Sequence, residues 1–174
     1  MDLDAVAQLL REGKIAELNQ KIALVPASNA GKVVYFATIL HAHHLKVAAL
    51  LDSDAAGEQA AHQDTLVQTL GNKSILRTKD SYSGPVEKPE VEDLLRETLV
   101  VIAKTDLGWD VSKLAADQPK RPIVDILSSV AEFSKYKLGK AFLRWSRTNQ
   151  ATSLTAEEQK QWALLIERIN KALK

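Results

Sequence analysis

The chain has 174 residues, which suits one well-packed domain or a compact α/β unit with a helical extension and is too short for two large independent domains. Its 23 Lys and Arg against 22 Asp and Glu leave a formal charge of +1, so any contact with nucleic acid needs a local basic patch. The lack of cysteine excludes disulfides, thiolate zinc sites and a cysteine nucleophile. No apolar run approaches the roughly 18 residues of a membrane span and the N-terminus does not read as a signal peptide, so we expect a cytoplasmic protein without membrane contact.

The first half of the sequence alternates predicted helices with predicted strands. Apolar residues make up 45% of the chain but aromatic residues only 5%. This composition suits a core of Leu, Ile, Val and Ala between helices and a parallel sheet. The segment 46–51 does not alternate between apolar and polar residues, which is typical of a strand buried on both faces. We expect helices at residues 2–19, from the turn at 28–31 to about 44, and at 55–70, and strands at 22–25, 46–51 and 74–77. Such an order predicts crossover helices on a parallel sheet.

The second half of the sequence reads as helical. Helices are expected near residues 90–103, 123–145 and 155–173, with a Pro-containing linker at 117–122. Thr155 followed by Glu158 three residues later is typical of a capping box at a helix start. We therefore predict an α/β core in residues 1–104 and a helical extension in residues 105–174 that packs on or beside it.

The strongest chemical signal is Asp52-Ser53-Asp54, which follows the strand predicted at 46–51. Carboxylates at the carboxyl edge of a parallel strand face the crevice in which α/β proteins bind ligands. Two carboxylates there repel each other unless a cation lies between them, and hard oxygen ligands select Mg²⁺ or Mn²⁺, ions that often bridge to substrate phosphates. The alternative interpretation is a turn in which Asp54 caps the following helix.

A second acidic motif lies some forty residues further on. Glu92 and Asp93 stand early in the helix predicted from about residue 90, where one acidic position can turn toward the edge of the sheet. A third carboxylate would complete a metal cluster with Asp52 and Asp54. The alternative is that these acidic residues only complement the positive end of the helix dipole.

Together, these motifs resemble the Toprim nuclease domain of the OLD (overcoming lysogenization defect) family. The resemblance implies a Toprim-like Rossmannoid parallel sheet flanked by helices, with Mg²⁺ or Mn²⁺ serving phosphodiester cleavage and two ions in the intact protein. It implies that Asp52 and Asp54 form the aspartate pair and that Glu92 is the later metal ligand, with Asp93 beside it. Residues 133–141 resemble the family's lysine segment, in which Lys137 is our choice for the catalytic lysine. Lys135 and Lys140 are the alternatives.

One feature of the family pattern is missing from the sequence. The family's first glutamate follows an apolar strand that precedes a helix like the one predicted at 2–19, and neither Glu12 nor Glu17 matches it. We therefore expect a fragment cut just inside its Toprim domain, with a degenerate family member as the alternative. The resemblance also implies an upstream ABC-type ATPase domain, through which homo-oligomers would form. No Gly-rich Lys-Ser/Thr phosphate loop occurs in this chain.

The leading functional hypothesis is a divalent-metal-dependent DNA endonuclease domain. DNA would approach along the penultimate predicted helix, on a basic strip formed by Lys135, Lys137, Lys140, Arg144 and Arg147. One alternative is a catalytically incomplete DNA-docking or scaffold module, which the missing glutamate motivates. Another is a phosphatase with Asp52 as nucleophile, although Ala56 stands where that chemistry usually has Thr or Val.

Overall fold

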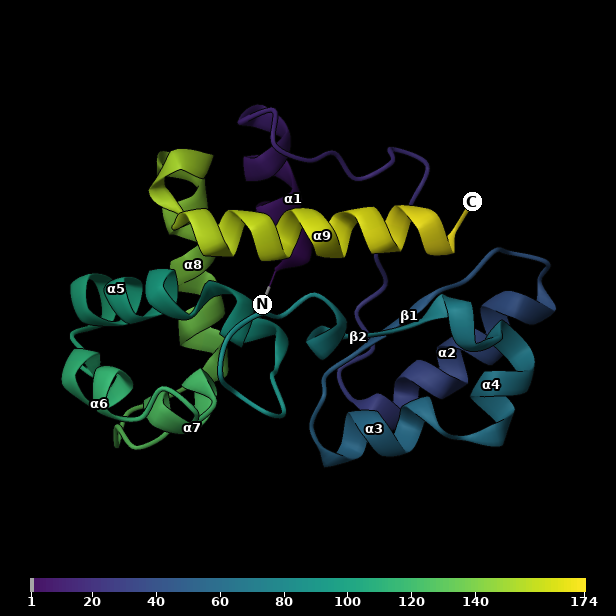
Figure 1. The fold of residues 1–174 in the computed structure, drawn as a ribbon, viewed down its shortest axis with the longest axis horizontal. Helices are drawn as coiled ribbons and strands as arrows, with labels where there is room; N and C mark the ends of the chain where they lie inside the picture. The colour runs from purple at the N-terminus through teal and green to yellow at the C-terminus, as the bar shows by residue number, and fades with distance from the viewer. Residues whose placement is uncertain (1) are drawn as a thin grey trace.

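The computed structural model describes residues 2–174, in which helices surround a small two-stranded parallel sheet. The fold is thus mixed α/β with little sheet, and helices account for most of the regular structure (Figure 1). Strand β1 is Ala49–Leu51 and strand β2 is Ile75–Arg77, paired in the register Ala49↔Ile75. Both strands were predicted, and so was their parallel direction. No helix in residues 2–174 is long and apolar enough to cross a membrane.

The first helix, α1, spans Leu3–Glu12 and begins where Asp2 accepts a hydrogen bond from the backbone N–H of Ala5 at 3.2 Å. Val6, Leu9 and Leu10 are buried along one face, as the sequence periodicity predicted. The prediction that this helix continues to residue 19 was wrong. Gly13 caps the helix and the next residue has a positive φ, so the chain leaves the helix seven residues early.

The segment 22–25 was predicted as a strand, and this prediction was also wrong. The segment runs without regular structure and joins no ladder in the described chain. Helix α2 follows at Ala30–Ala42, where Asn29 caps it by accepting a hydrogen bond from the backbone N–H of Lys32 at 3.0 Å. The apolar run alone predicted a strand at 22–25, but a strand also needs a partner for its backbone groups.

The crossover between the strands contains two short helices instead of the single helix predicted at 55–70. Helix α3 is Ala55–Ala61 and helix α4 is Asp64–Leu70. His62 and Gln63 interrupt them, and Gly71 ends the second with a positive φ. A short 3-10 turn, η1 at Asn72–Ser74, then leads into β2.

The rest of the chain is helical, as predicted, but it is more finely divided. The region expected as a helix from residue 90 starts as a 3-10 turn, and the helix expected at 123–145 is broken at 128–134. The elements in order are η2 (Thr78–Asp80), η3 (Val91–Leu95), α5 (Arg96–Leu107), α6 (Ser112–Asp117), α7 (Ile123–Leu127), α8 (Lys135–Thr148), η4 (Ala151–Ser153) and α9 (Ala156–Ala172). The predicted linker coincides with the loop between α6 and α7.

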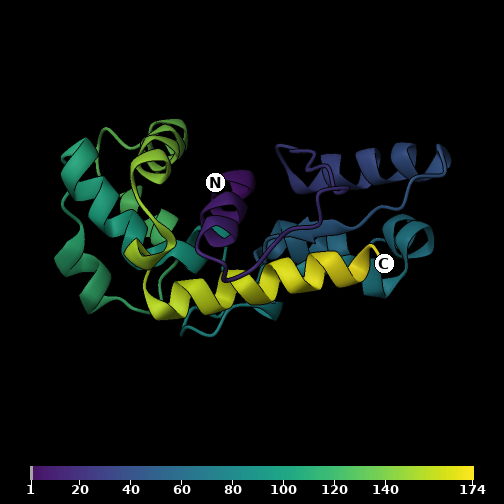
Figure 2. The same ribbon diagram turned by 90° about the horizontal axis from the view of Figure 1, so that it is seen from above.

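Two hydrophobic clusters divide the molecule into parts that we call the helical lobe and the small lobe. The helical lobe contains α1 and α5 to α9, and its core includes Trp162, Phe142 and Leu99. The small lobe contains α2, α3, α4 and most of the sheet, around Leu66. Helix α9 reaches from the helical lobe across to the strands (Figures 1 and 2). The predicted boundary at residue 104 stays a prediction, but α1 and α5 pack with the C-terminal helices.

Candidate functional site

Two loops of the chain meet Asp52 at the carboxyl ends of the two strands. The backbone N–H of Val91 donates to Asp52 Oδ1 at 2.8 Å, and the hydroxyl of Thr78 donates to the same oxygen at 3.3 Å. Thr78 follows β2, and Val91 begins η3. The strand order therefore brings three distant segments together around one carboxylate, at the edge where α/β proteins bind ligands.

Ser53 connects the same three segments through its own hydrogen bonds. Its backbone N–H donates to the carbonyl of Pro89 at 3.0 Å, and its hydroxyl oxygen accepts from the backbone N–H of Lys79 at 2.9 Å. Ser53 is fully enclosed, with 1% of its surface exposed. Its position between two aspartates thus serves to hold the site in place.

Asp54 caps helix α3. Its Oδ1 accepts a hydrogen bond from the backbone N–H of Gly57 at 2.7 Å, the arrangement that the alternative interpretation predicted. Gly57 is required there because a side-chain carbon at this position would overlap the carbonyl oxygen of Asp52. Only one carboxylate oxygen of Asp54 is used by the cap, so the capping role leaves the metal prediction for Asp54 untested.

Glu90 and Glu92 lie beside Asp52, and a lysine from helix α8 reaches them. Lys135 Nζ lies 2.8 Å from Glu90 Oε2 and 3.6 Å from Glu92 Oε1. The Glu92 side chain is only 7% exposed, whereas that of Lys135 is 52% exposed. We call Asp52, Glu90 and Glu92, together with Lys135, the acidic cluster. It brings four charged groups from three parts of the chain to one edge of the sheet.

The charges of the acidic cluster act on one another. Burial raises the pKa of Asp52, a hydrogen bond from the Val91 N–H opposes this change, and the negative charges of Glu92 and Glu90 raise the pKa further. Burial alone would lower the pKa of Lys135, but its hydrogen bond to Glu90 and the neighbouring carboxylates outweigh burial, so this pKa is raised. The carboxylates therefore favour a cation among them, and in this structure the lysine ammonium is that cation.

Asp93 turns away from the acidic cluster. Its Oδ2 accepts from the backbone N–H of Glu90 at 2.9 Å and its Oδ1 accepts from the backbone N–H of Ile123 at 2.7 Å. Burial raises the pKa of Asp93 to about 6, against the effect of these two hydrogen bonds and of Arg96. Both oxygens are thus engaged in joining η3 to the start of α7, which is a structural role.

Lys137, the predicted catalytic lysine, is exposed on α8. At 100° per residue, Lys135 and Lys137 lie about 200° apart around the helix, so they point to nearly opposite sides. Lys137 instead shares its side with Lys140, Arg144 and Arg147, which are all exposed. The predicted basic strip therefore exists without Lys135, and that lysine belongs to the acidic cluster.

The described residues fit a divalent cation only in part. No group of three or more His, Asp or Glu side chains in residues 2–174 is arranged to hold a metal ion. Mg²⁺, however, is often held by one or two carboxylates and completed by water and substrate phosphates. Asp52 and Glu92 supply that donor set, and their mutual repulsion favours a cation. Glu90 and Thr78 are residues of this site that the sequence did not assign to it: Glu90 stands in the second acidic motif and fitted a helix-dipole role, and Thr78 belongs to no recognisable motif.

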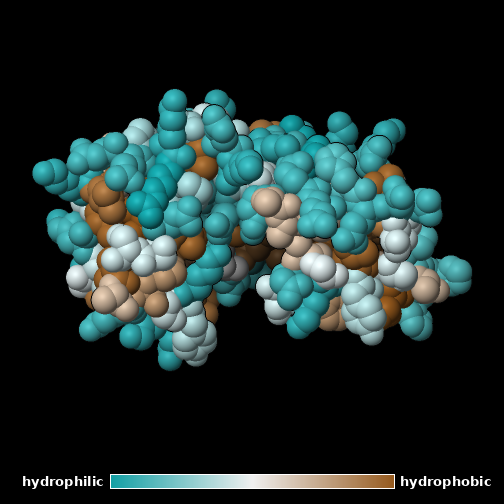
Figure 3. All heavy atoms as spheres, turned by 90° about the horizontal axis from the view of Figure 1, so that it is seen from below, coloured by the Kyte–Doolittle hydropathy of each residue, from teal (hydrophilic) through white to brown (hydrophobic). Residues whose placement is uncertain are grey.

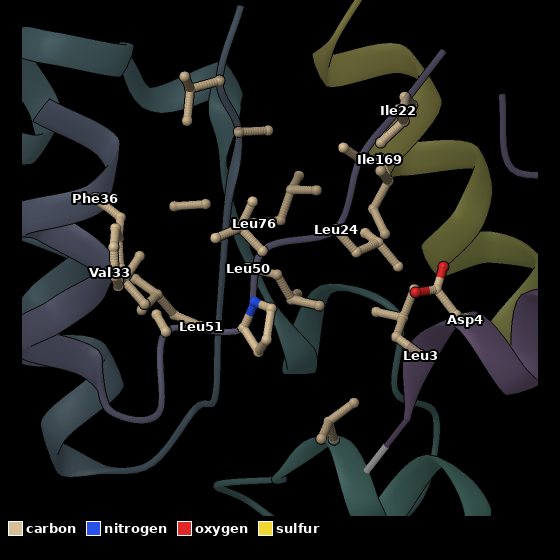
Figure 4. Close-up of a pocket in the computed structure, with 18 of the residues that line it drawn as sticks. Leu3, Asp4, Ile22, Leu24, Val33, Phe36, Leu50, Leu51, Leu76 and Ile169 are labelled. Atoms are coloured by element: carbon tan, nitrogen blue, oxygen red, sulfur yellow. The ribbon is translucent and has the colours of Figure 1, made fainter. Parts of the chain in front are cut away.

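A deep groove opens beside the acidic cluster, between the two lobes. It has a volume of about 1330 Å³, and Asp52 and Val91 lie on its wall. Figure 3 shows a hollow between two masses of the molecule, with hydrophobic surface inside it. The close-up in Figure 4 shows Leu24, Leu50 and Leu76 among the side chains that line it. We call this feature the apolar groove.

Comparison with known protein families, with curated proteins and with solved structures finds no match to this chain.

Proposed function

We propose that the chain is a divalent-metal-dependent DNA endonuclease domain, similar to the Toprim domain of OLD-family proteins. The observation that supports this proposal best is the acidic cluster. Asp52 after β1, Glu92 on η3 and Lys135 on α8 are far apart in the sequence but meet at the carboxyl edge of a parallel sheet. The family resemblance rests on the same three segments, with Lys137 as the chosen lysine and Lys135 as an alternative.

Asp52 and Glu92 would hold the ion in this proposal, and Asp54 would be the third ligand that the family resemblance implies. A bound Mg²⁺ or Mn²⁺ supplies a Lewis acid for the phosphate and lowers the pKa of a bound water. Thr78 and Val91 fix the orientation of the Asp52 carboxylate through their hydrogen bonds. Groups that are held in a fixed orientation before the reaction stabilise the charge that develops on the phosphate in the transition state.

Lys135 takes the role of the functional lysine in this proposal, in place of Lys137. Its ammonium lies within the acidic cluster and half of its side chain is exposed, so it can turn toward a phosphate. Lys137, Lys140, Arg144 and Arg147 line the exposed side of the same helix. They would hold the DNA backbone, and the affinity for DNA would fall as salt rises.

The central test compares the wild-type chain with Asp52→Asn and Glu92→Gln. Mn²⁺ and Mg²⁺ are titrated by calorimetry, and supercoiled plasmid is incubated with each protein and each metal. We expect metal binding to weaken at least about tenfold in either variant, since each removes one of two carboxylate ligands, and nicking to be lost. The matched controls Asp117→Asn and Glu167→Gln alter exposed carboxylates that are not part of the cluster. Unchanged metal binding in both site variants would refute the proposal.

The choice between the two lysines is tested with Lys135→Met and Lys137→Met. Removing the Lys135 ammonium takes a competing cation from the carboxylates, so metal affinity without DNA should rise by roughly fivefold, about 1 kcal/mol. Nicking should fall because the phosphate loses its positive neighbour. Lys137→Met should leave metal affinity unchanged and weaken only the binding of DNA. The opposite pattern would restore Lys137 as the functional lysine.

A second candidate function is a DNA-docking module without catalysis. The observation that favours it is the engagement of Asp54 in the cap of α3, together with the lack of a group of three metal-binding side chains in residues 2–174. This candidate predicts salt-sensitive DNA binding that Asp52→Asn leaves unchanged and that Lys140→Gln and Arg144→Gln weaken. Plasmid nicking would then be absent with every metal.

A further inference from the structure

In residues 2–174, one edge of strand β1 is hydrogen-bonded to another strand and the other edge is open. It pairs with β2 alone, and within residues 2–174 no other segment forms a ladder with it. A two-stranded parallel sheet with an open edge leaves backbone N–H and C=O groups available for a further strand. The apolar groove adjoins this strand, since Ala49, Leu50 and Leu51 all line it.

The opposite wall of the apolar groove is the extended segment 22–25, as Figure 4 shows for Ile22 and Leu24. Ile22 and Leu24 are half-buried, whereas Ala23 and Val25 are exposed, which is the two-residue alternation of a strand. No hydrogen bond from the described chain reaches the backbone of Ala23, Leu24 or Val25. This segment therefore has the pattern of a strand but lacks the neighbour that would make it one.

Helix α2, which forms another wall of the groove, also leaves apolar side chains uncovered. Helix α2 is apolar around most of its circumference, and yet Ala37 is its only buried residue. Val33, Phe36 and Leu40 line the groove from this helix. On the far side, Ile169 of α9 and Leu3 of α1 close the groove (Figure 4). Any occupant would consequently have apolar side chains against both of its faces.

From these walls we propose that the apolar groove accepts one extended, apolar peptide strand, supplied by another polypeptide segment, between β1 and residues 22–25. Its backbone would pair with β1 on one side and with residues 22–25 on the other, turning two strands into four. Its sequence would be a continuous run of Val, Ile and Leu, because it would be buried on both faces. The groove volume of about 1330 Å³ exceeds the roughly 300–1,000 Å³ of pockets for small molecules, which favours a peptide over such a ligand.

The test uses a synthetic peptide with the core Ser-Val-Ile-Val-Leu-Val-Ser between paired lysines. Hydrogen exchange of the whole chain is followed with and without it. At ten times its Kd the peptide should slow exchange of the amides at 23–25 and 47–51 by about tenfold relative to the free chain. A matched peptide with Pro in place of the central Val should have little effect, because Pro cannot donate to a ladder. Equal protection by both peptides would refute strand pairing.

Two variants locate the peptide in the groove. Leu24→Lys places a charge on the groove wall and should weaken peptide binding at least about tenfold, since a buried charge without a partner is unfavourable. Leu164→Lys changes a partly exposed leucine on α9 outside the groove and should leave binding unchanged. Both proteins should keep the helical circular dichroism of the wild type, because neither leucine belongs to a hydrophobic core cluster.

Other occupants are separate outcomes of the same experiment. Protection of 23–25 and 47–51 by decanoate but not by the peptide would identify a lipid pocket and overturn the proposal. Protection that rises with protein concentration alone, together with a dimer in sedimentation, would make a second copy of the chain the occupant and would also overturn it. The readout is amide exchange, so the outcome does not depend on the proposed nuclease activity.

Discussion

Glu92 and Asp93 are neighbours in the sequence but serve different purposes. Glu92 faces Asp52 and Lys135, whereas Asp93 uses both oxygens to accept backbone N–H groups. Successive residues in a tight helical turn point in different directions, so two adjacent acidic residues cannot both face one small site. The role of Asp93 as a metal ligand therefore stays a prediction that its contacts do not support.

The Asp93 contacts predict a structural effect. Asp93→Ala would leave the backbone N–H groups of Glu90 and Ile123 without their acceptor in a buried region, because Asp93 is only 2% exposed. The free energy of unfolding should fall by about 2–4 kcal/mol, measured by urea denaturation. Metal affinity per folded molecule should stay the same. A stable Asp93→Ala variant with weakened Mn²⁺ binding would instead return Asp93 to the metal site.

At the residue scale, the sequence predicted that Asp52 stands at the end of a strand, whereas the choice between Lys137 and Lys135 as the functional lysine stays a prediction. Asp52 follows a buried apolar run, so its place at the end of a strand was readable from the pattern. Lys135 and Lys137 stand in one short basic segment about 200° apart around α8, and which of them faces the acidic cluster depends on how that helix packs. Ser134 caps α8, so the helix begins at Lys135, a detail that the charge pattern alone does not contain.

At the scale of elements, helix caps determine where predictions succeeded. Helix α9 starts where predicted because Thr155 and Glu158 form a reciprocal capping box. Helix α1 ends early because Lys14, which follows the capping residue Gly13, has a positive φ, although apolar residues continue at helical spacing beyond it. Hydrophobic spacing thus identified the helices, whereas single capping residues set their ends.

The Glu158 side chain extends the capping box into a tertiary contact. Its Oε1 accepts from the backbone N–H of Thr98 at 2.9 Å, and its Oε2 accepts from the Thr98 hydroxyl at 2.8 Å. It therefore joins the start of α9 to α5 inside the helical lobe, at 3% exposure. Glu158→Ala should lower the free energy of unfolding by roughly 2–4 kcal/mol, through the lost cap and two buried donors.

The matched variant is Glu167→Ala, on the exposed side of the same helix. Because its carboxylate makes no buried hydrogen bond, it should change the free energy of unfolding by less than about 0.5 kcal/mol. Thermal and urea unfolding of both variants would be compared with the wild type. Similar losses in the two variants would show that the effect comes from helix propensity or net charge, and that the link to Thr98 contributes little.

At the scale of the whole molecule, the sequence predicted a parallel α/β arrangement followed by helices but not how the helices are shared. Helix α1 precedes the strands in the sequence, yet it packs in the helical lobe with α8 and α9. Such long-range packing depends on which apolar faces are complementary in shape. The hydrophobic periodicity of one segment does not indicate which other segment its apolar face contacts. The segment 22–25 likewise has the apolar residues of a strand but joins no ladder in residues 2–174.

The two hydrophobic clusters differ in size and composition, and this difference predicts unequal stability. The core of the small lobe consists mostly of alanines around Leu66, whereas the helical lobe encloses Trp162, Phe142 and many leucines. Alanine buries little apolar surface, so each residue of the small lobe gains less free energy on folding. We expect the small lobe to open locally while the helical lobe stays folded.

Amide hydrogen exchange measures this difference directly. Amides in α2, α3 and α4 should exchange at least about 30-fold faster than those in α5 and α9, which corresponds to an opening free energy lower by roughly 2 kcal/mol. Leu66→Ala should accelerate exchange further in the small lobe alone, because Leu66 is fully buried there. Leu99→Ala, its counterpart in the helical lobe, should accelerate exchange throughout the chain, because the small lobe depends on α9 to cover its strands. Uniform protection across both lobes in the wild type would show instead that the two clusters unfold as one cooperative unit.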